Sequence, residues 1–199
     1  MPKIPEEVYR EIRKYALKLA RRGYVTAHGG NISIRSGNIM WITRHASSLE
    51  NLRFEDIIQV YVDKPSSFDA LASTETIVHR KIYLKTPNLA IVHAHPPSTV
   101  ALTFFYDEII PLDSEAYYVL KKVPVVEGSP GSENLALNVA EKLKTCYAVA
   151  VRAHGVFTAA KYLDIAYQYM CMVEHSSKII LLTEGLKNLG LKFIKPRKF

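Results

Sequence analysis

The chain has 199 residues, of which 48% are hydrophobic and 23% charged, and its formal net charge is +7. This length and balance are typical of one globular domain, so we expect a single domain over residues 1–199 rather than a disordered chain. No apolar run approaches the roughly 20 residues that a membrane-spanning helix needs, and the N-terminal segment lacks the apolar core of a secretion signal. We therefore predict a cytoplasmic protein with no membrane partner.

The basic residues are spread along the chain, apart from Arg21, Arg22 and the tail 191–199. A nucleic-acid-binding protein needs a clustered basic face, so the sequence argues against nucleic acid as a partner. A positive field that attracts small anionic substrates explains the charge equally well. Cys146 and Cys171 lack the spacing of a metal site, and we expect both thiols to be reduced.

Apolar periodicity and turn residues predict strands and helices that are interspersed along the chain. In chain order, the patterns predict a helix over 5–22, a β-hairpin over 31–43, a strand over 56–63, a helix over 75–85 capped by Ser73 or Thr74, a strand over 88–95, a helical segment over 98–106, a short strand over 121–128, a helix over 131–144, a strand over 147–155 and a long helix over 163–190. Because hairpins rather than regular crossovers join several strands, we expect an α/β fold with helices packed on a mixed or mainly antiparallel sheet.

The segment "VHAH" places His93 and His95 two residues apart in a predicted strand. Side chains at this spacing point to the same face, so the two imidazoles lie close enough to share a metal ion. Pro96 and Pro97 end the strand there, which puts the pair at an exposed rim. Taken alone, the pair is a weak signal, and ordinary surface or core histidines are the favoured interpretation.

Three further residues strengthen the metal hypothesis. His154 ends an apolar strand, where Gly155 permits a tight turn. Glu75 opens a helix, where a carboxylate is favoured, and Asn31 follows two glycines that let the backbone approach an anion. A core histidine, a dipole-complementing glutamate and a turn asparagine are the simpler alternatives for each residue alone, but they do not explain the combination.

The combination resembles the class II aldolase/adducin family in its aldolase branch, which includes the fuculose-phosphate aldolases. The matching segments are "GGNIS" (29–33), "WIT" (41–43), "ASTE" (72–75), "VHAH" (92–95) and "AHGV" (153–156). Their order and spacing agree over roughly residues 5–185. The resemblance implies an α/β/α sandwich around a largely antiparallel sheet, and a homotetramer of four-fold symmetry with active sites at the subunit interfaces.

The resemblance also implies a role for each matching residue. His93, His95 and His154 become ligands of one Zn²⁺ per subunit, and Glu75 becomes a further ligand at rest and the catalytic base. Phosphate binding falls to Asn31, Thr43, Ser47, Ser73 and Thr74. Three neutral imidazoles bind Zn²⁺ and leave room for substrate, the ion stabilises an enediolate as a Lewis acid, and a neighbouring carboxylate moves the proton.

Two segments depart from the family pattern. After "WIT" the family usually has a Pro-Thr/Ser-Gly loop, whereas this chain continues with Arg44, His45, Ala46 and Ser47. Whether Arg44 and His45 bind substrate or form a solvated loop stays open, and so does the shape of the phosphate pocket.

The second departure lies in "DSEAYY" (113–118), the segment that matches a catalytic tyrosine of the family. That tyrosine reaches into the neighbouring subunit's site. Glu115 falls at its position, with Tyr117 and Tyr118 close behind. Glu115 and Tyr117 are our candidates for proton transfer at the departing aldehyde, with packing aromatics as the alternative for the tyrosines.

The function that follows is a zinc-dependent aldolase, which reversibly cleaves a phosphorylated ketose to dihydroxyacetone phosphate and an aldehyde such as lactaldehyde. A sugar-phosphate 4-epimerase, a methylthioribulose-1-phosphate dehydratase or a decarboxylase on the same scaffold is the alternative. A non-catalytic adducin-like domain is less favoured, because loss of metal ligands would mark that branch and this chain keeps the whole set.

Overall fold

The computed structural model describes residues 4–194, so the end of the basic tail lies outside it. The helices are α1 Glu6–Arg21, α2 Thr76–Lys85, α3 Pro97–Leu102, α4 Ser114–Leu120, α5 Glu133–Lys142 and α6 Leu163–Asn188, with short 3-10 turns at Leu49–Asn51, Phe54–Asp56 and Ser67–Leu71. The strands are β1 Asn31–Ser36, β2 Ile39–Thr43, β3 Ile57–Tyr61, β4 Ala90–Ala94, β5 Glu108–Ile109, β6 Val123–Val126, β7 Ala148–Val151 and β8 Gly155–Ala160. None of these helices has the length and apolar character required to cross a membrane.

The strands form one eight-stranded sheet in the order β3-β2-β1-β4-β8-β7-β6-β5. Its neighbours run antiparallel, except for the parallel pair β6 and β7. The expected α/β fold with a mainly antiparallel sheet is therefore confirmed. Strand β4 lies near the middle, between β1 and β8, and this central place makes it a rigid support for any side chain at its end.

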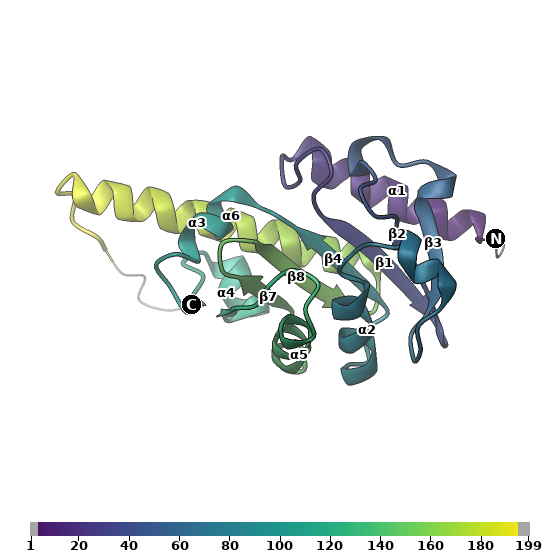
Figure 1. Ribbon diagram of the computed structural model, residues 1–199. Coiled ribbons are helices and arrows are strands. Elements are labelled where there is room, and N and C mark those ends of the chain that lie inside the picture. The colour runs from purple at the N-terminus through teal and green to yellow at the C-terminus, as the bar shows by residue number, and fades with distance from the viewer. Residues whose placement is uncertain (1–3, 195–199) are drawn as a thin grey trace.

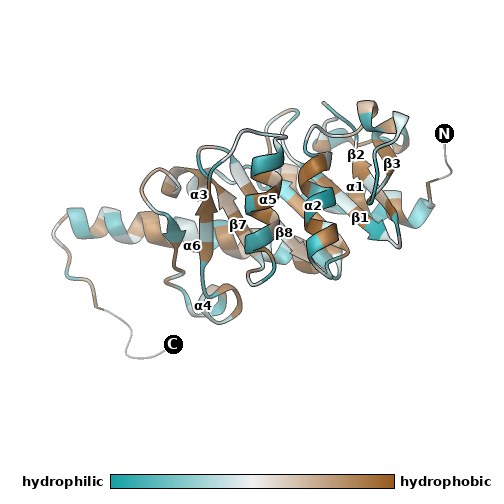
Figure 2. Ribbon diagram, turned by 60° about the horizontal axis from the view of Figure 1, so that its bottom comes forward, coloured by the Kyte–Doolittle hydropathy of each residue, from teal (hydrophilic) through white to brown (hydrophobic). Residues whose placement is uncertain are grey.

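Helices cover both faces of the sheet (Figure 1). Ile91 packs in the core cluster under α2 and α5, whereas Val92 belongs to the cluster under α1 and α6. Figure 2 shows α2 and α5 next to each other across their face of the sheet. Because alternate residues of β4 face opposite layers, His93 points to the side of α2.

Several element boundaries differ from the sequence predictions. The strand predicted over 147–155 ends at Val151, and residues 152–154 form a turn before β8, which the sequence analysis missed. Neither Ser73 nor Thr74 caps α2, because the N-cap residue is Glu75 and no side chain caps it. The predicted helical segment after the prolines ends early, at Leu102, and is followed by β5 and α4, which were also not predicted.

Candidate metal centre

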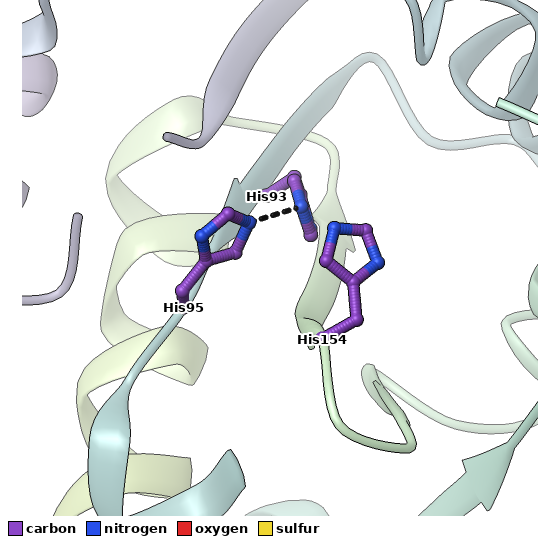
Figure 3. A group of neighbouring side chains, drawn as sticks. All are labelled: His93, His95 and His154. Carbon is purple, nitrogen blue, oxygen red and sulfur yellow. Dashed lines mark hydrogen bonds between the residues drawn. The ribbon is translucent and has the colours of Figure 1, made fainter. Parts of the chain in front are cut away.

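His93 and His95 stand together at the end of β4. His93 lies within the strand and His95 just beyond it, where the His95 backbone N–H donates to the Tyr24 carbonyl at 2.7 Å. Their Nε2 atoms are 2.9 Å apart and their ring centroids 4.8 Å apart (Figure 3). The expected side-by-side placement is confirmed, and two nitrogen atoms face the same point.

His154 reaches the pair from the turn between β7 and β8 (Figure 3). Its ring centroid lies 4.8 Å from that of His93 and 5.0 Å from that of His95. One ligand atom from each of the three rings can be chosen so that all lie within 4.8 Å of one another. Together these histidines form a group that can hold a divalent metal ion.

The turn that carries His154 is tied to the end of α3. The Ala153 backbone N–H donates to Thr103 Oγ1 at 3.1 Å, and Ala153 itself takes a left-handed conformation with φ of 58°. The Arg152 guanidinium donates to the Thr103 carbonyl and forms an ion pair with Glu127 at 2.6 Å. These contacts hold the turn, and therefore the His154 ring, against the rest of the domain.

Gly155 has a different role from the one predicted. It is Ala153, not Gly155, that adopts a positive φ in the turn. A Cβ on Gly155 would meet the Ala94 carbonyl oxygen first, and it would lie 2.6 Å from Cδ2 of His95 and 3.0 Å from Cε1 of His93. Glycine is required here because β8 passes directly against the backbone at the end of β4 and against the two imidazoles.

Glu75 brings a carboxylate to the same point from the start of α2. Its Oε2 atom lies 3.0 Å from Nε2 of His93, and its Oε1 atom lies 3.8 Å from Nε2 of His154. Asn31 Nδ2 donates to Oε2 at 3.1 Å. Among the described residues, Oε1 has no hydrogen-bond partner although it is buried, and the same holds for Nδ1 of His154.

Burial sets the protonation states of these groups. It lowers the pKa of His93 well below its ordinary value, lowers that of His95 to about 4, and lowers that of His154. It raises the pKa of Glu75 to about 7, an increase that the hydrogen bond from Asn31 opposes. The three imidazoles are therefore neutral near pH 7, which is the form that binds a metal ion.

The atoms present fit a divalent cation. Nδ1 of His93 lies 3.0 Å from the Val156 carbonyl oxygen, which can only accept a hydrogen bond, so Nδ1 carries the proton. Nε2 of His93 therefore presents a lone pair to Glu75 Oε2 and to His95. Such closely spaced acceptors need a proton or a cation between them, and nitrogen and carboxylate donors of this kind suit Zn²⁺.

A cavity of about 210 Å³ opens in front of the histidines. Besides the three histidines and Glu75, it is lined by Gly29, Gly30, Asn31, Ala46, Ser73 and Thr74, together with the four residues His28, Arg44, His45 and Pro130. The roles of Arg44 and His45 were left open by the sequence, and His28 and Pro130 were not predicted as site residues. Gly131, which follows Pro130, lies close to the backbone of Thr74. A Cβ added at Gly131 would be 2.9 Å from the Thr74 carbonyl oxygen, so glycine lets this loop approach the site.

The other predicted site residues lie elsewhere in the described chain. The buried Thr43 hydroxyl accepts from the Ile32 backbone N–H at 3.3 Å, and Ser47 Oγ donates to the Arg44 carbonyl at 2.8 Å, so both residues shape the loop beside the cavity. Glu115 and Tyr117 are on α4 and do not line this cavity.

A further residue, His79, was missed. It is fully buried one helical turn after Glu75, where Nε2 lies 2.6 Å from Asn31 Oδ1. The four-residue spacing within one helix could have indicated that the two side chains share a face.

Comparison with known proteins agrees with this geometry. Residues 10–181 match the family profile described as the class II aldolase and adducin N-terminal domain. The chain belongs to the class II aldolase and adducin family. Within that family, it is 31% identical to an L-fuculose phosphate aldolase of Methanococcus maripaludis over 185 residues, covering 89% of this chain and 98% of the relative.

Other members of the class II aldolase and adducin family are also similar to this chain over most of its length. The crystal structure of L-fuculose-1-phosphate aldolase from Thermus thermophilus superposes with a TM-score of 0.89 at 32% identity, covering 95% of this chain and 100% of that one. A methylthioribulose-1-phosphate dehydratase of Methylococcus capsulatus is 28% identical over 183 residues, covering 83% of this chain and 89% of the relative. The relatives named here differ in the reaction that their names give.

Proposed function

We propose that this protein is a zinc-dependent aldolase that reversibly cleaves a phosphorylated ketose resembling L-fuculose 1-phosphate. The products are dihydroxyacetone phosphate and an aldehyde such as lactaldehyde. The observation that carries the proposal is the convergence of His93, His95, His154 and the buried Glu75 carboxylate on one cavity. The similarity to two fuculose-phosphate aldolases supports the choice of reaction.

The residues of the metal centre have two different roles, metal binding and proton transfer. A zinc ion held by the three histidines supplies Lewis acidity to the oxygen atoms beside the bond that breaks. Glu75 delivers a proton to the carbon atom left behind in cleavage and takes it back in the reverse reaction. In the metal-free site, burial raises the pKa of Glu75 to about 7, and a carboxyl group in this position can both take and release a proton.

The substrate phosphate is assigned to Asn31, Ser73 and Thr74, which line the cavity. Ser73 and Thr74 precede α2, where backbone N–H groups favour an anion. Thr43 and Ser47 contribute by holding the loop that carries Arg44 and His45. The net charge of +7 favours the approach of an anionic substrate.

The second proton-transfer group comes from a neighbouring copy of the chain. In cleavage, it takes the proton from the hydroxyl group that becomes the aldehyde oxygen. Glu115 and Tyr117 are proposed for this role in a homotetramer with interfacial sites. Supporting this assembly, Phe104, Phe105 and Tyr118 expose 60%, 80% and 65% of their surface around α3 and α4, which is typical of an interaction face.

One observation favours a second candidate, a dehydratase acting on methylthioribulose 1-phosphate. A relative of that name matches the chain at 28% identity. Glu115 also puts a carboxyl group where the resemblance expects a tyrosine, and this change of proton-transfer group favours a different leaving group.

The test is a zinc-supplemented assay of the purified protein with the 1-phosphates of fuculose, ribulose, rhamnulose and methylthioribulose, and with ribulose 5-phosphate. Cleavage, dehydration and epimerisation are scored separately. Cleavage of fuculose 1-phosphate or another ketose 1-phosphate to dihydroxyacetone phosphate supports the aldolase. Dehydration or epimerisation without cleavage would replace it with the corresponding alternative, and purified protein that neither contains nor binds zinc would overturn the metal centre.

A further inference from the structure

A row of buried polar side chains starts at Glu75 and Asn31, which line the cavity, and continues away from it between α2 and β1. Helix α2 contributes Glu75, His79 and Tyr83, each separated by four residues, so they form one stripe facing the sheet. Strand β1 contributes Asn31 and Ser33, which are two residues apart and share one face. These five residues, which we name the polar row, are between 0% and 6% exposed.

Hydrogen bonds connect the polar row from one end to the other. Asn31 joins Glu75 to His79, through its Nδ2 atom at 3.1 Å from Glu75 Oε2 and its Oδ1 atom at 2.6 Å from His79 Nε2. Ser33 joins His79 to Tyr83, because its Oγ atom lies 2.7 Å from both His79 Nδ1 and the Tyr83 hydroxyl. Each member therefore contacts the next, and Glu75 is the only one that reaches the metal centre.

The direction of each hydrogen bond follows from the chemistry of the groups. An ionised carboxylate only accepts, so the Asn31 amide must turn its N–H toward Glu75 and its carbonyl toward His79. That carbonyl also only accepts, so His79 must carry a proton on Nε2. A neutral ring then has an unprotonated Nδ1, which accepts from the Ser33 hydroxyl, while Ser33 Oγ accepts from Tyr83.

The surroundings of His79 keep its ring neutral. The side chain is fully buried, and burial lowers its pKa to about 3. Its nearest aromatic neighbour is Phe157, whose ring stands edge-on at 6.1 Å from it and stacks on the His93 ring at 4.1 Å. Apolar contacts on this side and hydrogen bonds at both nitrogen atoms leave the ring one orientation in which every polar atom is satisfied.

We propose that His79 is a positioning residue of the metal centre, which acts by fixing the orientation of the Asn31 amide. Donation from Nε2 holds the Asn31 carbonyl and so keeps the Asn31 N–H directed at Glu75 Oε2. The reversed amide would place two acceptors against each other and displace the carboxylate from His93. This inference rests on the proposed function only in taking Glu75 and the three histidines as a zinc site.

The first test reads the His79 tautomer directly. Protein labelled with ¹⁵N-histidine is examined by NMR with and without zinc, and His79 signals are identified by their loss in the variant His79→Gln. We expect a neutral ring with its proton on Nε2 in both samples. A proton on Nδ1, or a charged ring at pH 7, would overturn the proposal whether or not the protein is an aldolase.

The second test compares two substitutions of His79. His79→Gln keeps a donor for Asn31 and an acceptor for Ser33, whereas His79→Leu keeps a side chain of some bulk and has neither. We expect His79→Leu to bind zinc about tenfold more weakly, as for other outer partners of metal ligands, with a matching loss in kcat. His79→Gln should lose less than about threefold in zinc affinity, which is below the roughly 10–100-fold loss that removal of an outer partner causes.

The controls separate positioning from general damage and from failure of the assigned reaction. His175→Leu removes an exposed histidine on α6 and should change nothing. Thermal unfolding of the zinc-free variants shows whether a substitution has damaged the fold. If the Leu and Gln variants bind zinc equally well, or lose zinc affinity by the same factor, the proposal is overturned. A difference in zinc affinity without any aldolase turnover would support His79 and count against the proposed reaction instead.

Discussion

At the scale of single residues, Glu75 is the side chain on which the proposed chemistry depends. A Glu75→Gln substitution keeps the shape of the side chain and removes its ability to move a proton. We expect kcat to fall by at least about a hundredfold, the usual contribution of a general acid–base group. Zinc content should persist, because the three histidines remain, and metal analysis with steady-state kinetics checks both. The matched control is Glu50→Gln on an exposed 3-10 turn, and full turnover in Glu75→Gln would contradict the assignment.

Gly155 offers a test of the close packing behind the histidines. Gly155→Ala places a Cβ atom against both imidazoles, so we expect the zinc affinity to fall by about tenfold or more, as when the support of a metal ligand is lost. Gly185→Ala is the control, since nothing lies within 4 Å of its added Cβ on helix α6. That control should leave zinc binding unchanged and stabilise the protein by roughly 0.5–1 kcal/mol. Equal zinc affinity in both variants would refute this view of Gly155.

His79 also predicts how stability depends on pH in zinc-free protein. Its folded-state pKa is about 3, lowered by burial, while an unfolded histidine has its ordinary value near 6.5. Below that value the unfolded chain binds a proton that the folded chain does not, so acidification destabilises the fold. From about pH 6.5 to about pH 5 this group alone should cost about 2 kcal/mol.

Urea unfolding of the parent and of His79→Gln at several pH values isolates this contribution. The free energies of unfolding should converge by about 2 kcal/mol on acidification, because the variant lacks the titrating group. If the free energies of unfolding of the two proteins changed in parallel with pH, His79 would bind its proton equally well in the folded and unfolded states, and the prediction would be wrong.

Of the histidines around the site, the sequence predicted His93 and His95 but not His79. His93 and His95 were placed correctly because the two-residue period of a strand is strict and the prolines marked its end. His79 was missed because one histidine among apolar residues of a helix carries no pattern of its own. Its role depends on Asn31 and Ser33, which are distant in sequence and meet it only through the packing of α2 on β1.

At the scale of elements, α3 is anchored by a buried carboxylate from α6. Glu174 is fully buried and accepts from the backbone N–H groups of Ser98 at 3.1 Å and Thr99 at 2.9 Å. It also accepts from the Thr99 hydroxyl at 2.9 Å. This contact fixes the start of α3, two residues after His95, and links the longest helix to the rim of the site.

Replacing this anchor should destabilise the fold. Glu174→Gln presents amide N–H groups to backbone donors, so we expect a loss of roughly 2 kcal/mol in the free energy of unfolding. Glu184→Gln removes a partly exposed carboxylate paired with Lys187 and should cost less than about 0.5 kcal/mol. Denaturant titration measures both, and similar values for the two variants would contradict the anchoring role.

Element boundaries were harder to predict than element types. Strand β8 was missed because its six residues, Gly155–Ala160, follow β7 after a turn that contains no proline and no asparagine. The left-handed residue of that turn is Ala153, a residue type with no turn preference, and tertiary contacts with Thr103 impose its conformation. Local patterns cannot reveal a turn that is stabilised from outside.

At the scale of the whole molecule, the exposed apolar residues bear on assembly. Phe104, Phe105 and Tyr118 lie near α3 and α4, and Leu182 and Leu186 lie on the part of α6 that projects beyond the sheet in Figure 1. The described residues of one chain leave these side chains exposed. In the proposed homotetramer, Glu115 and Tyr117 would serve the cavity of a neighbouring subunit, and a single sequence does not place such a subunit.

Light scattering coupled to gel filtration tests the assembly. The proposed homotetramer should have a mass about four times the 22.5 kDa of one chain. Phe105→Glu places a charge in the exposed apolar region, so we expect smaller species and a parallel loss of turnover, with zinc content retained. A monomeric parent protein with full activity would contradict both the assembly and a second proton-transfer group from a neighbour.

The three histidines are carried by elements of different rigidity, and this difference affects the rate at which a metal ion is released. His93 is on the central strand, where hydrogen exchange should be slowest, and His95 directly follows it, whereas His154 is on a turn held by a few hydrogen bonds. A bound ion would therefore leave when this turn opens, and its residence time would report the opening rate of residues 152–154. The opening of residues 152–154 would then determine how long an ion stays bound, while the sheet determines where it binds.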